Sequence, residues 1–230
     1  MTRLSQLISL LHLSDPTLPI GGYSHSSGLE TYVQERIVKD AESAKHYIKN
    51  MLCHNVLYND ASFARWAYQA AKEGDIEELK KLDVECSALK SPQEIRAASH
   101  KLGARLIKIF RAERPFHFAA QYEEFINQAP RRGHYCLVYG MYGALLEISL
   151  EDAVGSFFFN AATSMTTNAV KLIPLGQLDG QHILFELEKM IPGLTQKTIA
   201  LERKFAGLCC IGLDIRCMQH ERLYSRLYMS

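Results

Sequence analysis

The helical pattern of this sequence is interrupted at residues 10–30, LLHLSDPTLPIGGYSHSSGLE. This segment constrains the backbone conformation more than any other part of the chain does. Pro16 and Pro19 have a fixed φ and no backbone N–H, and each disfavours the helical conformation in the residue before it. The first helix must therefore end near Ser14. We call residues 10–30 the elbow, because the pattern predicts a rigid turn between two helices.

The second half of the elbow carries glycines and polar residues. Gly21 and Gly22 permit a positive φ or a close backbone approach. A second helix then runs through Glu30 and Tyr32. Three serines are candidates for its N-cap: Ser24, Ser26 and Ser27. The turn would therefore display polar side chains from a fixed backbone.

Three interpretations of the elbow compete on residue types alone. Glycines before a helix N-terminus are typical of phosphate sites, but the GxxxxGK[ST] and GxGxxG patterns are absent. Ser24 and His25 are a serine and a base, but neighbours in sequence rarely face one another and no GxSxG pattern follows a strand. A purely structural turn is the interpretation that serine and glycine content favours.

The rest of the chain shows helical periodicity and no strand alternation. In the first helix, the apolar stripe of Leu4, Leu7, Ile8 and Leu11 is expected to be buried. Residues 134–148 are apolar nearly all round, which predicts a central, buried helix, and Gly140 and Gly143 are small enough for close approach. About ten helical segments without repeats or linkers predict an all-α fold, a single layered helical domain over residues 1–230.

Capping residues divide this helical sequence. Asp40 and Ser149 are typical N-caps, and Gly74 interrupts the pattern between two helices. Asn59 or Asp60 is expected to start a new helix. A further helix is expected to begin with a capping box and a proline at its first position, in Ser91-Pro92-Gln93-Glu94.

Composition excludes several classes of protein. The 230 residues are 47% hydrophobic and 22% charged, and 26 basic and 25 acidic residues are mixed along the chain, so no basic surface for nucleic acid is expected. The longest weakly polar run, residues 135–146, is too short to span a bilayer, and the N-terminus is typical of an amphipathic helix rather than a signal peptide. Six cysteines without CxxC spacing are typical of reduced thiols. We therefore expect a soluble, cytoplasmic protein without a nucleic-acid or membrane partner.

Three segments resemble a known family. The run LxLSDPTLPIGGYSHSSGLE at residues 11–30 is similar to the N-terminal signature of the urease accessory protein F family. Residues 213–230, LDIRCMQHERLYSRLYMS, resemble the C-terminal tail of that family, and Pro174-Leu175-Gly176-Gln177 resembles a third family segment. Residues from about 60 to 135 carry little of the resemblance.

The resemblance implies a role in the insertion of nickel into apo-urease. Members of this family act as adaptors or chaperones that bridge a urease-binding accessory protein, called D or H, and the nickel-carrying GTPase G. They form homodimers and are not known as enzymes. The resemblance therefore implies a non-catalytic protein with no tightly bound cofactor. Nickel would contact this protein at most in transit. The residues implied in partner binding are Pro19, Gly21, Gly22, Tyr23, Ser24, His25, Gly28, Glu30, Tyr32, His220, Glu221, Arg222, Tyr224 and Arg226.

The C-terminal tail, residues 213–230, is expected to become ordered on partner binding. It mixes apolar residues with arginines at the end of the chain, where ordering costs entropy that a partner surface can offset. We expect its helix to form when D or H binds. Arg226 would then contact the elbow helix, with Glu30 and the Tyr32 hydroxyl as candidate acceptors.

Two other classes of function stay open. A direct activator of GTPase G would supply an arginine finger. The candidates for it are Arg131, Arg132, Arg222 and Arg226. A helical hydrolase is less favoured, because no nucleophile, base and orienting acid can be assembled without assuming three long-range contacts.

Metal binding has its own candidates. Cys217 and His220 lie about one helical turn apart, Glu221 adds an oxygen, and His25 in the elbow is a comparable candidate ligand. Two ligands on one turn are a weak signal, and packing or surface display is the alternative. The other histidines considered fall singly on separate segments, where a structural or exposed role is more common. None of them is part of an HExxH motif. They are His54, His100, His117 and His134.

Overall fold

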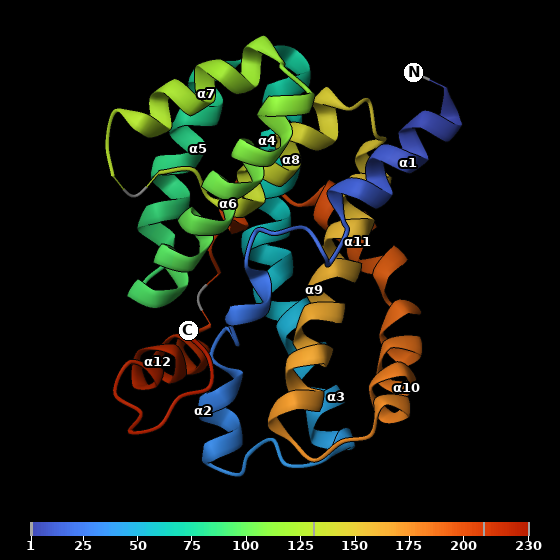
Figure 1. The fold of residues 1–230 in the computed structure, drawn as a ribbon, viewed down its shortest axis with the longest axis vertical. Coiled ribbons are helices and arrows are strands. Elements are labelled where there is room, and N and C mark those ends of the chain that lie inside the picture. The colour runs from blue at the N-terminus through green and yellow to red at the C-terminus, as the bar shows by residue number, and fades with distance from the viewer. Residues whose placement is uncertain (1, 131, 209, 230) are drawn as a thin grey trace.

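The computed structural model describes residues 2–130, 132–208 and 210–229 (Figure 1). These residues form helices and connecting turns, with no β-strand among them, so the predicted all-α fold is confirmed. Three residues that the sequence analysis used, Arg131, Cys209 and Ser230, lie outside the described part of the chain.

The helices follow the chain in order. They are α1 (Arg3–Leu13), η1 (Gly22–Ser24), α2 (Leu29–Gln34), α3 (Ala41–Asn50), η2 (Met51–Ala61), α4 (Ser62–Glu73), α5 (Ile76–Leu89), α6 (Gln93–Glu113), α7 (His117–Asn127), α8 (Tyr135–Leu145), α9 (Leu150–Leu172), α10 (Gln177–Glu188), α11 (Ile191–Ala200), η3 (Arg203–Phe205) and α12 (Ile211–His220). The segments η1 and η3 are 3₁₀ turns, whereas η2 is a π-helix.

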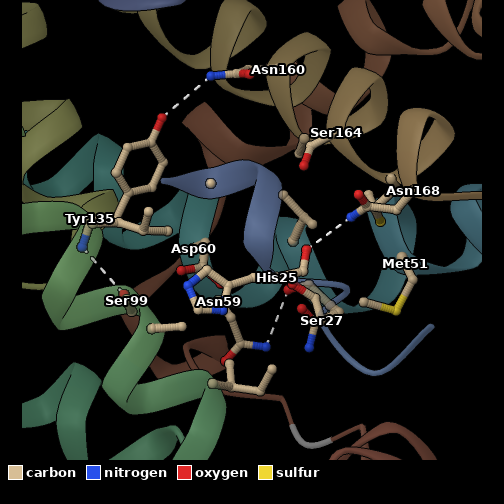
Figure 2. Close-up of a pocket in the computed structure, with 18 of the residues that line it drawn as sticks. His25, Ser27, Met51, Asn59, Asp60, Ser99, Tyr135, Asn160, Ser164 and Asn168 are labelled. Atoms are coloured by element: carbon tan, nitrogen blue, oxygen red, sulfur yellow. Dashed lines mark hydrogen bonds between the residues drawn. The ribbon is translucent and has the colours of Figure 1, made fainter. Parts of the chain in front are cut away.

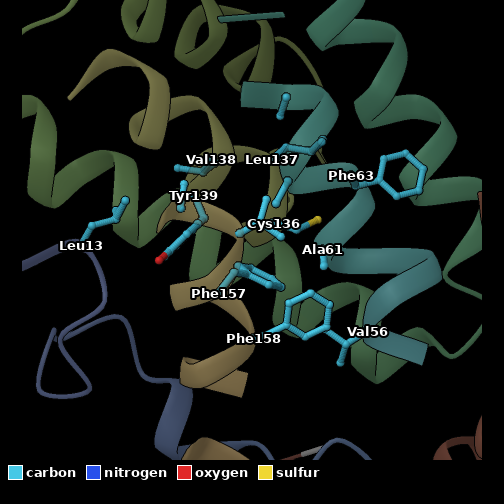
Figure 3. Packing of buried hydrophobic residues seen from close by; sticks show 14 of the residues in the cluster. Leu13, Val56, Ala61, Phe63, Cys136, Leu137, Val138, Tyr139, Phe157 and Phe158 are labelled. Atoms are coloured by element: carbon cyan, nitrogen blue, oxygen red, sulfur yellow. The ribbon is translucent and has the colours of Figure 1, made fainter. Parts of the chain in front are cut away.

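The hydrophobic core is built around α8, as its apolar sequence predicts. Residues 136–143 of this helix are all buried. Figure 3 shows the side chains of residues 136–139 together with Phe157 and Phe158 of α9 and Phe63 of α4. Gly140 allows α8 to lie directly against α4, because a Cβ at this position would be 1.9 Å from the backbone oxygen of Ala64.

The expected helix start at Asn59 or Asp60 is wrong, because α3, η2 and α4 follow one another without a break. No side chain caps the start of α4. The amide of Asn59 donates to the backbone oxygen of Asn55 at 3.1 Å, and the carboxylate of Asp60 pairs with Lys90 at 2.8 Å. Both side chains are thus used in contacts other than a cap.

Most of the other predicted caps are confirmed. The side chains of Asp40 and Ser149 accept backbone hydrogen bonds at the starts of α3 and α9. Gly74 ends α4 with a φ of 72°. The capping box at Ser91 is wrong, because Pro92 itself is the N-cap residue of α6 and no side chain caps that helix.

Helix α1 does not bury the stripe that its periodicity predicts. Leu4, Leu7, Ile8 and Leu11 are 67%, 49%, 57% and 59% exposed. The chain packs on the other side of α1, where Leu13 is buried. The predicted burial is wrong because periodicity identifies an apolar face but does not say which surface covers it.

No helix of the described chain is long and apolar enough to cross a membrane. The five cysteines in the described part of the chain are free thiols. Cys86 and Cys136 lie side by side with their sulfur atoms 3.9 Å apart, far beyond the length of a disulfide bond.

Candidate functional site

The elbow begins where the sequence predicts. Helix α1 ends at Leu13, and Ser14 is its C-cap residue. The side chain of Asp15 accepts the N–H of Thr17 at 2.7 Å, which closes the turn between the two prolines. Further along, the elbow is tied to the fold because Arg105 of α6 donates to the backbone oxygen of Ile20 at 2.9 Å.

The second helix of the elbow starts at Leu29, later than a serine cap would place it. Its N-cap residue is Gly28, with a φ of 87°. Ser26 still contacts the first turn, because its Oγ accepts the N–H of Glu30 at 3.4 Å. Ser24 instead donates to the backbone oxygen of Gly21 at 2.8 Å, within the elbow.

Two glycines of the elbow lie in close contacts. Gly21 has a φ of 85°, and a Cβ there would be 2.1 Å from Nη1 of Arg105. Gly28 has a φ of 87°, and a Cβ there would be 2.7 Å from the Cys217 sulfur of α12. A Cβ at Gly22, in contrast, would meet no atom within 4 Å. The geometry of the elbow therefore depends on Gly21 and Gly28 rather than on Gly22.

We expect Gly21→Ala to destabilise the protein and Gly22→Ala to have little effect. Alanine at position 21 would adopt a positive φ, which costs about 1 to 2 kcal/mol, and it would displace Arg105 from its hydrogen bond with Ile20. Chemical unfolding of both variants measures the difference. Equal free energies of unfolding would contradict the assignment of the turn geometry to Gly21.

Glu30 joins the elbow to the C-terminal tail. The residue is only 4% exposed. Oε1 accepts the backbone N–H of Leu227 at 2.7 Å, and Oε2 accepts that of Tyr228 at 3.1 Å. Oε2 also lies 3.1 Å from Nε2 of His220. One buried side chain of α2 thus holds both α12 and the residues after it, which lie beside α2 in Figure 1.

His220 extends this contact to α6. The side chain is fully buried, and its Nδ1 lies 2.7 Å from Oε2 of Glu94. The other oxygen of Glu94 accepts from Arg226 at 2.7 Å. Glu30, His220, Glu94 and Arg226 therefore form one chain of polar contacts across α2, α12, α6 and the tail.

In the chain without a partner, Arg226 does not contact the elbow helix, so its expected contact with Glu30 or Tyr32 on partner binding stays a prediction. Arg226 pairs with Glu94 of α6, because the two oxygens of Glu30 are already filled by main-chain N–H groups and His220. The tail still lies on the elbow, since the N–H of Met229 donates to the backbone oxygen of Ser24 at 2.9 Å. These contacts are made within the chain, and the ordering of residues 213–230 by a partner stays a prediction.

The residues implied in partner binding fall into three groups by exposure. Those with exposed side chains are Pro19, Tyr23, Glu221, Arg222, Tyr224 and Arg226. Those that are buried are Gly21, Gly28, Glu30 and His220. Those of intermediate exposure are Gly22, Ser24, His25 and Tyr32. The first group can meet a partner directly, whereas the buried group positions the backbone that presents it.

The three candidate metal ligands do not form one group of ligand atoms. Both ring nitrogens of His220 face carboxylate oxygens. Cys217 lies buried beneath Gly28, and burial raises the pKa of its thiol to about 12, so the thiolate that binds metals is disfavoured. Burial, with Lys101 and Arg105 nearby, lowers the pKa of His25. Metal binding by these residues stays a prediction.

A pocket of about 370 Å³ lies between the elbow, η2, α6, α9 and α12 (Figure 2). Asn168 of α9 closes one side by donating to the backbone oxygen of His25 at 2.8 Å. Asn160, about two helical turns earlier on α9, donates to the hydroxyl of Tyr135 at 3.3 Å. His25 and Cys217 both line this pocket, which is where the elbow and α12 face the centre of the fold.

Glu94 and Asn168 are the residues of this site that the sequence analysis did not identify as such. The sequence indicates Glu94 only as part of a helix cap, yet its partner His220 is 126 residues away. Asn168 lies on a helix whose sequence gave no reason to connect it with His25, 143 residues away. No local pattern could have indicated either contact, because both depend on how distant helices pack.

Comparison with known proteins places the chain among urease accessory proteins. A profile of the UreF family matches residues 38–188. The chain is 41% identical over 227 residues to the urease accessory protein UreF of Haemophilus influenzae strain Rd, covering 99% of this chain and 97% of the relative. UreF of Actinobacillus pleuropneumoniae serotype 5b is 39% identical and UreF of Bacillus sp. strain TB-90 is 32% identical, each over 99% of this chain and 100% of the relative.

Proposed function

The chain belongs to the UreF family of urease accessory proteins, and from this premise we propose that it is a non-catalytic adaptor in urease maturation. In this role it bridges the urease-binding accessory protein, D or H, and the GTPase G that brings nickel to apo-urease. We propose further that it acts as a homodimer in the cytoplasm and that nickel contacts it only in transit.

The observation that carries the proposal is the surface that the elbow and the tail form together. The two segments come from opposite ends of the chain and are joined by Glu30 and by the hydrogen bond from Met229 to Ser24. Tyr23 is 72% exposed, and Tyr224 is fully exposed. Exposed tyrosines with neighbouring arginines are typical of protein interfaces. A docking role uses these side chains, whereas an isolated chain has no use for them.

An adaptor needs at least two docking surfaces, and α1 offers the second. Its exposed leucine and isoleucine side chains form one helical face that nothing in the described chain covers. Apolar faces of this kind mark protein interfaces more often than free surface. The two surfaces support a protein that binds more than one partner at a time.

The alternative, an arginine finger for GTPase G, has fewer candidates than the sequence suggests. Arg132 donates to the backbone oxygen of Phe125 at 2.9 Å, and its guanidinium lies 3.9 Å from the centre of that ring. Arg226 pairs with Glu94. Arg222 is the exposed candidate for which the described chain shows no such side-chain contact.

Arg222→Ala and Arg226→Ala distinguish the adaptor from the finger. For the adaptor, we expect GTP hydrolysis by G to fall only in proportion to complex formation. Loss of the partly exposed Arg226–Glu94 pair costs about 1 kcal/mol or less, so binding should weaken by less than tenfold. Removal of a finger would lower single-turnover hydrolysis by about a thousandfold or more while the complex persists.

The two measurements are a pull-down with D or H and with G, and single-turnover hydrolysis in the purified complex. Arg222→Lys serves as a matched control that keeps the charge. A wild-type protein that binds neither partner would contradict the adaptor, and a complex that forms normally but hydrolyses GTP a thousandfold more slowly would support the finger.

A further inference from the structure

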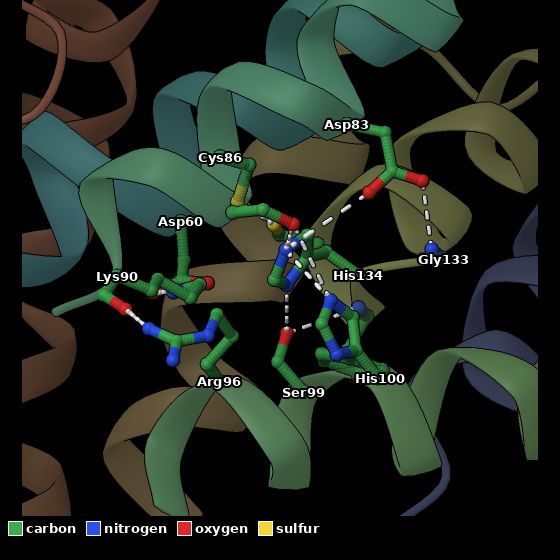
Figure 4. A network of polar contacts seen from close by, with 12 residues as sticks. Asp60, Asp83, Cys86, Lys90, Arg96, Ser99, His100, Gly133 and His134 are labelled. Carbon is green, nitrogen blue, oxygen red and sulfur yellow. Dashed lines mark hydrogen bonds and ion pairs between the residues drawn. The ribbon is translucent and has the colours of Figure 1, made fainter. Parts of the chain in front are cut away.

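A polar cluster lies inside the fold where α5, α6 and the start of α8 meet (Figure 4). Asp83 comes from α5, His100 from α6, and His134 is the N-cap residue of α8. Asp83 and His134 are fully buried, and His100 is 9% exposed. Buried polar side chains carry a large desolvation cost unless partners satisfy them, so their arrangement requires an explanation.

The ligand atoms of the three side chains surround one point. Nε2 of His134 lies 3.0 Å from Nε2 of His100 and 3.9 Å from Oδ1 of Asp83. All three atoms lie within 4.8 Å of one another. In a tetrahedral site with bonds of about 2.0 to 2.2 Å, ligand atoms are roughly 3.3 to 3.6 Å apart. The two distances from Nε2 of His134 lie on either side of this range.

One oxygen of Asp83 has no other use within the described chain. Oδ2 accepts the N–H of Gly133 at 2.7 Å and the hydroxyl of Tyr122 at 2.8 Å. Oδ1 is buried and accepts no hydrogen bond of normal geometry from any described residue. Its distance of 3.9 Å to His134 is too long for a hydrogen bond.

Hydrogen bonds outside the cluster orient its members as they do in metal sites. Nδ1 of His134 lies 3.1 Å from Oγ of Ser99, so Nε2 faces the other ligands. The contacts of Gly133 and Tyr122 turn Oδ1 of Asp83 in the same direction. Metal-binding histidines and carboxylates commonly have such outer partners, which fix ring orientation and tautomer.

A network without metal explains only part of this arrangement. If one imidazole donates its N–H to the other, the 3.0 Å contact between His100 and His134 is a hydrogen bond. Ser87 can join it, since its Oγ is 2.8 Å from Nε2 of His134. Oδ1 of Asp83 then remains a buried oxygen without a partner, which costs about 1 to 3 kcal/mol or more.

Three positively charged side chains near the cluster make contacts outside it, and one of them, Arg132, donates to the backbone oxygen of Phe125. Lys90 forms an ion pair with Asp60 at 2.8 Å, and Nη1 of Arg96 donates to the backbone oxygen of Lys90. Figure 4 shows both side chains to one side of the histidines. Within the described chain Asp83 forms no ion pair with Lys90, Arg96 or Arg132, so a bound cation would supply a charge partner for its carboxylate.

We propose that Asp83, His100 and His134 bind one divalent transition-metal ion through two imidazole nitrogens and one carboxylate oxygen. This set of ligands suits Zn²⁺, Ni²⁺ or Co²⁺, whereas Mg²⁺ and Ca²⁺ prefer sites made of oxygen. The ligands come from α5, α6 and the N-cap of α8 and are almost completely buried. The ion therefore acts as a structural link between α5, α6 and α8, independently of the adaptor function.

The test uses the full chain without a histidine tag, stripped of metal with a chelator and then given Zn²⁺, Ni²⁺, Co²⁺ or, as a control, Mg²⁺. We expect about one transition-metal ion for each chain after gel filtration, a higher midpoint of thermal unfolding, and no effect of Mg²⁺. The Co²⁺ form should show the visible absorption of a tetrahedral ion without a thiolate charge-transfer band.

Asp83→Asn and His100→Gln keep a similar size and polarity and should each lose the ion. The matched control is the double variant Cys217→Ser with His220→Gln, which should retain it, because these residues are outside the cluster. Helical circular dichroism checks the folding of each variant, and the Co²⁺ spectrum of the wild type decides the case where a variant does not fold. A wild type that retains no ion, or variants at positions 83 and 100 that retain as much as the wild type, would overturn the proposal.

Discussion

Glu30→Gln is expected to release residues 221–229 from α2. The carboxylate of Glu30 accepts the N–H groups of Leu227 and Tyr228 and faces His220. Glutamine keeps one acceptor oxygen and places an NH₂ group where the second oxygen was, so at least one N–H group loses its partner. A hydrogen bond to a charged group contributes about 1.5 to 3 kcal/mol, and the buried groups left behind add to the loss.

The effect should be local, because the released segment lies at the end of the chain and can separate without unfolding the core. Amide hydrogen exchange measures it: the amides of residues 221–229 should exchange much faster in Glu30→Gln, while those of α8 should not change. Binding of G should fall in the same variant if the surface of elbow and tail is the docking surface.

Gln34→Ala is the matched control for this prediction. Its amide donates to the backbone oxygen of Ser225 at 2.9 Å, so it also holds the tail, but from an exposed position. An exposed hydrogen bond contributes little, and we expect almost normal exchange. Equal protection of residues 221–229 in both variants would mean that the carboxylate of Glu30 is not what fixes the tail.

Elements with local causes could be predicted from the sequence. The end of α1 follows from Pro16, the start of α3 from Asp40, and the end of α4 from Gly74, because each acts on backbone groups within a few residues. The burial of α8 also follows from its own composition, since a helix that is apolar all round has no polar face to expose to water.

Elements that depend on a neighbouring part of the fold could not be predicted from the sequence. The stripe of α1 is as periodic as that of a buried helix, yet Leu4 is 67% exposed, because the pattern contains no information on what lies opposite. The start expected at Asp60 failed for the same reason: its carboxylate is taken by Lys90, which the chain brings close only after folding.

The candidate site shows this division most clearly. The resemblance to a family indicated Glu30 and His220 as important, but not that they touch or that Glu94 lies on the other side of the histidine. His100 and His134 each look structural when taken singly. They become a candidate metal site only because α6 crosses the start of α8, which brings residues 34 positions apart to 3.0 Å.

Gly140→Ala is expected to destabilise the core strongly, although it adds only one methyl group. In a helix, alanine is normally more favourable than glycine by about 0.5 to 1 kcal/mol. Here a Cβ would lie 1.9 Å from the backbone oxygen of Ala64 and 2.7 Å from its carbonyl carbon. A backbone atom cannot rotate away as a side chain can, so α4 and α8 must move apart.

Separation of these two helices would disturb the centre of the core, since residues 136–143 of α8 are all buried. Overpacking commonly costs about 1 to 3 kcal/mol, and we expect Gly140→Ala to reach the upper end of that range because both contacting groups are helical backbone. Gly143→Ala is the control on the same helix. A Cβ there would meet the side chains of Ala153 at 3.2 Å and Tyr68 at 3.4 Å, which small shifts can relieve. Chemical unfolding should therefore show a much larger decrease for Gly140→Ala than for Gly143→Ala, and equal values would mean that α4 and α8 are not in backbone contact at Gly140.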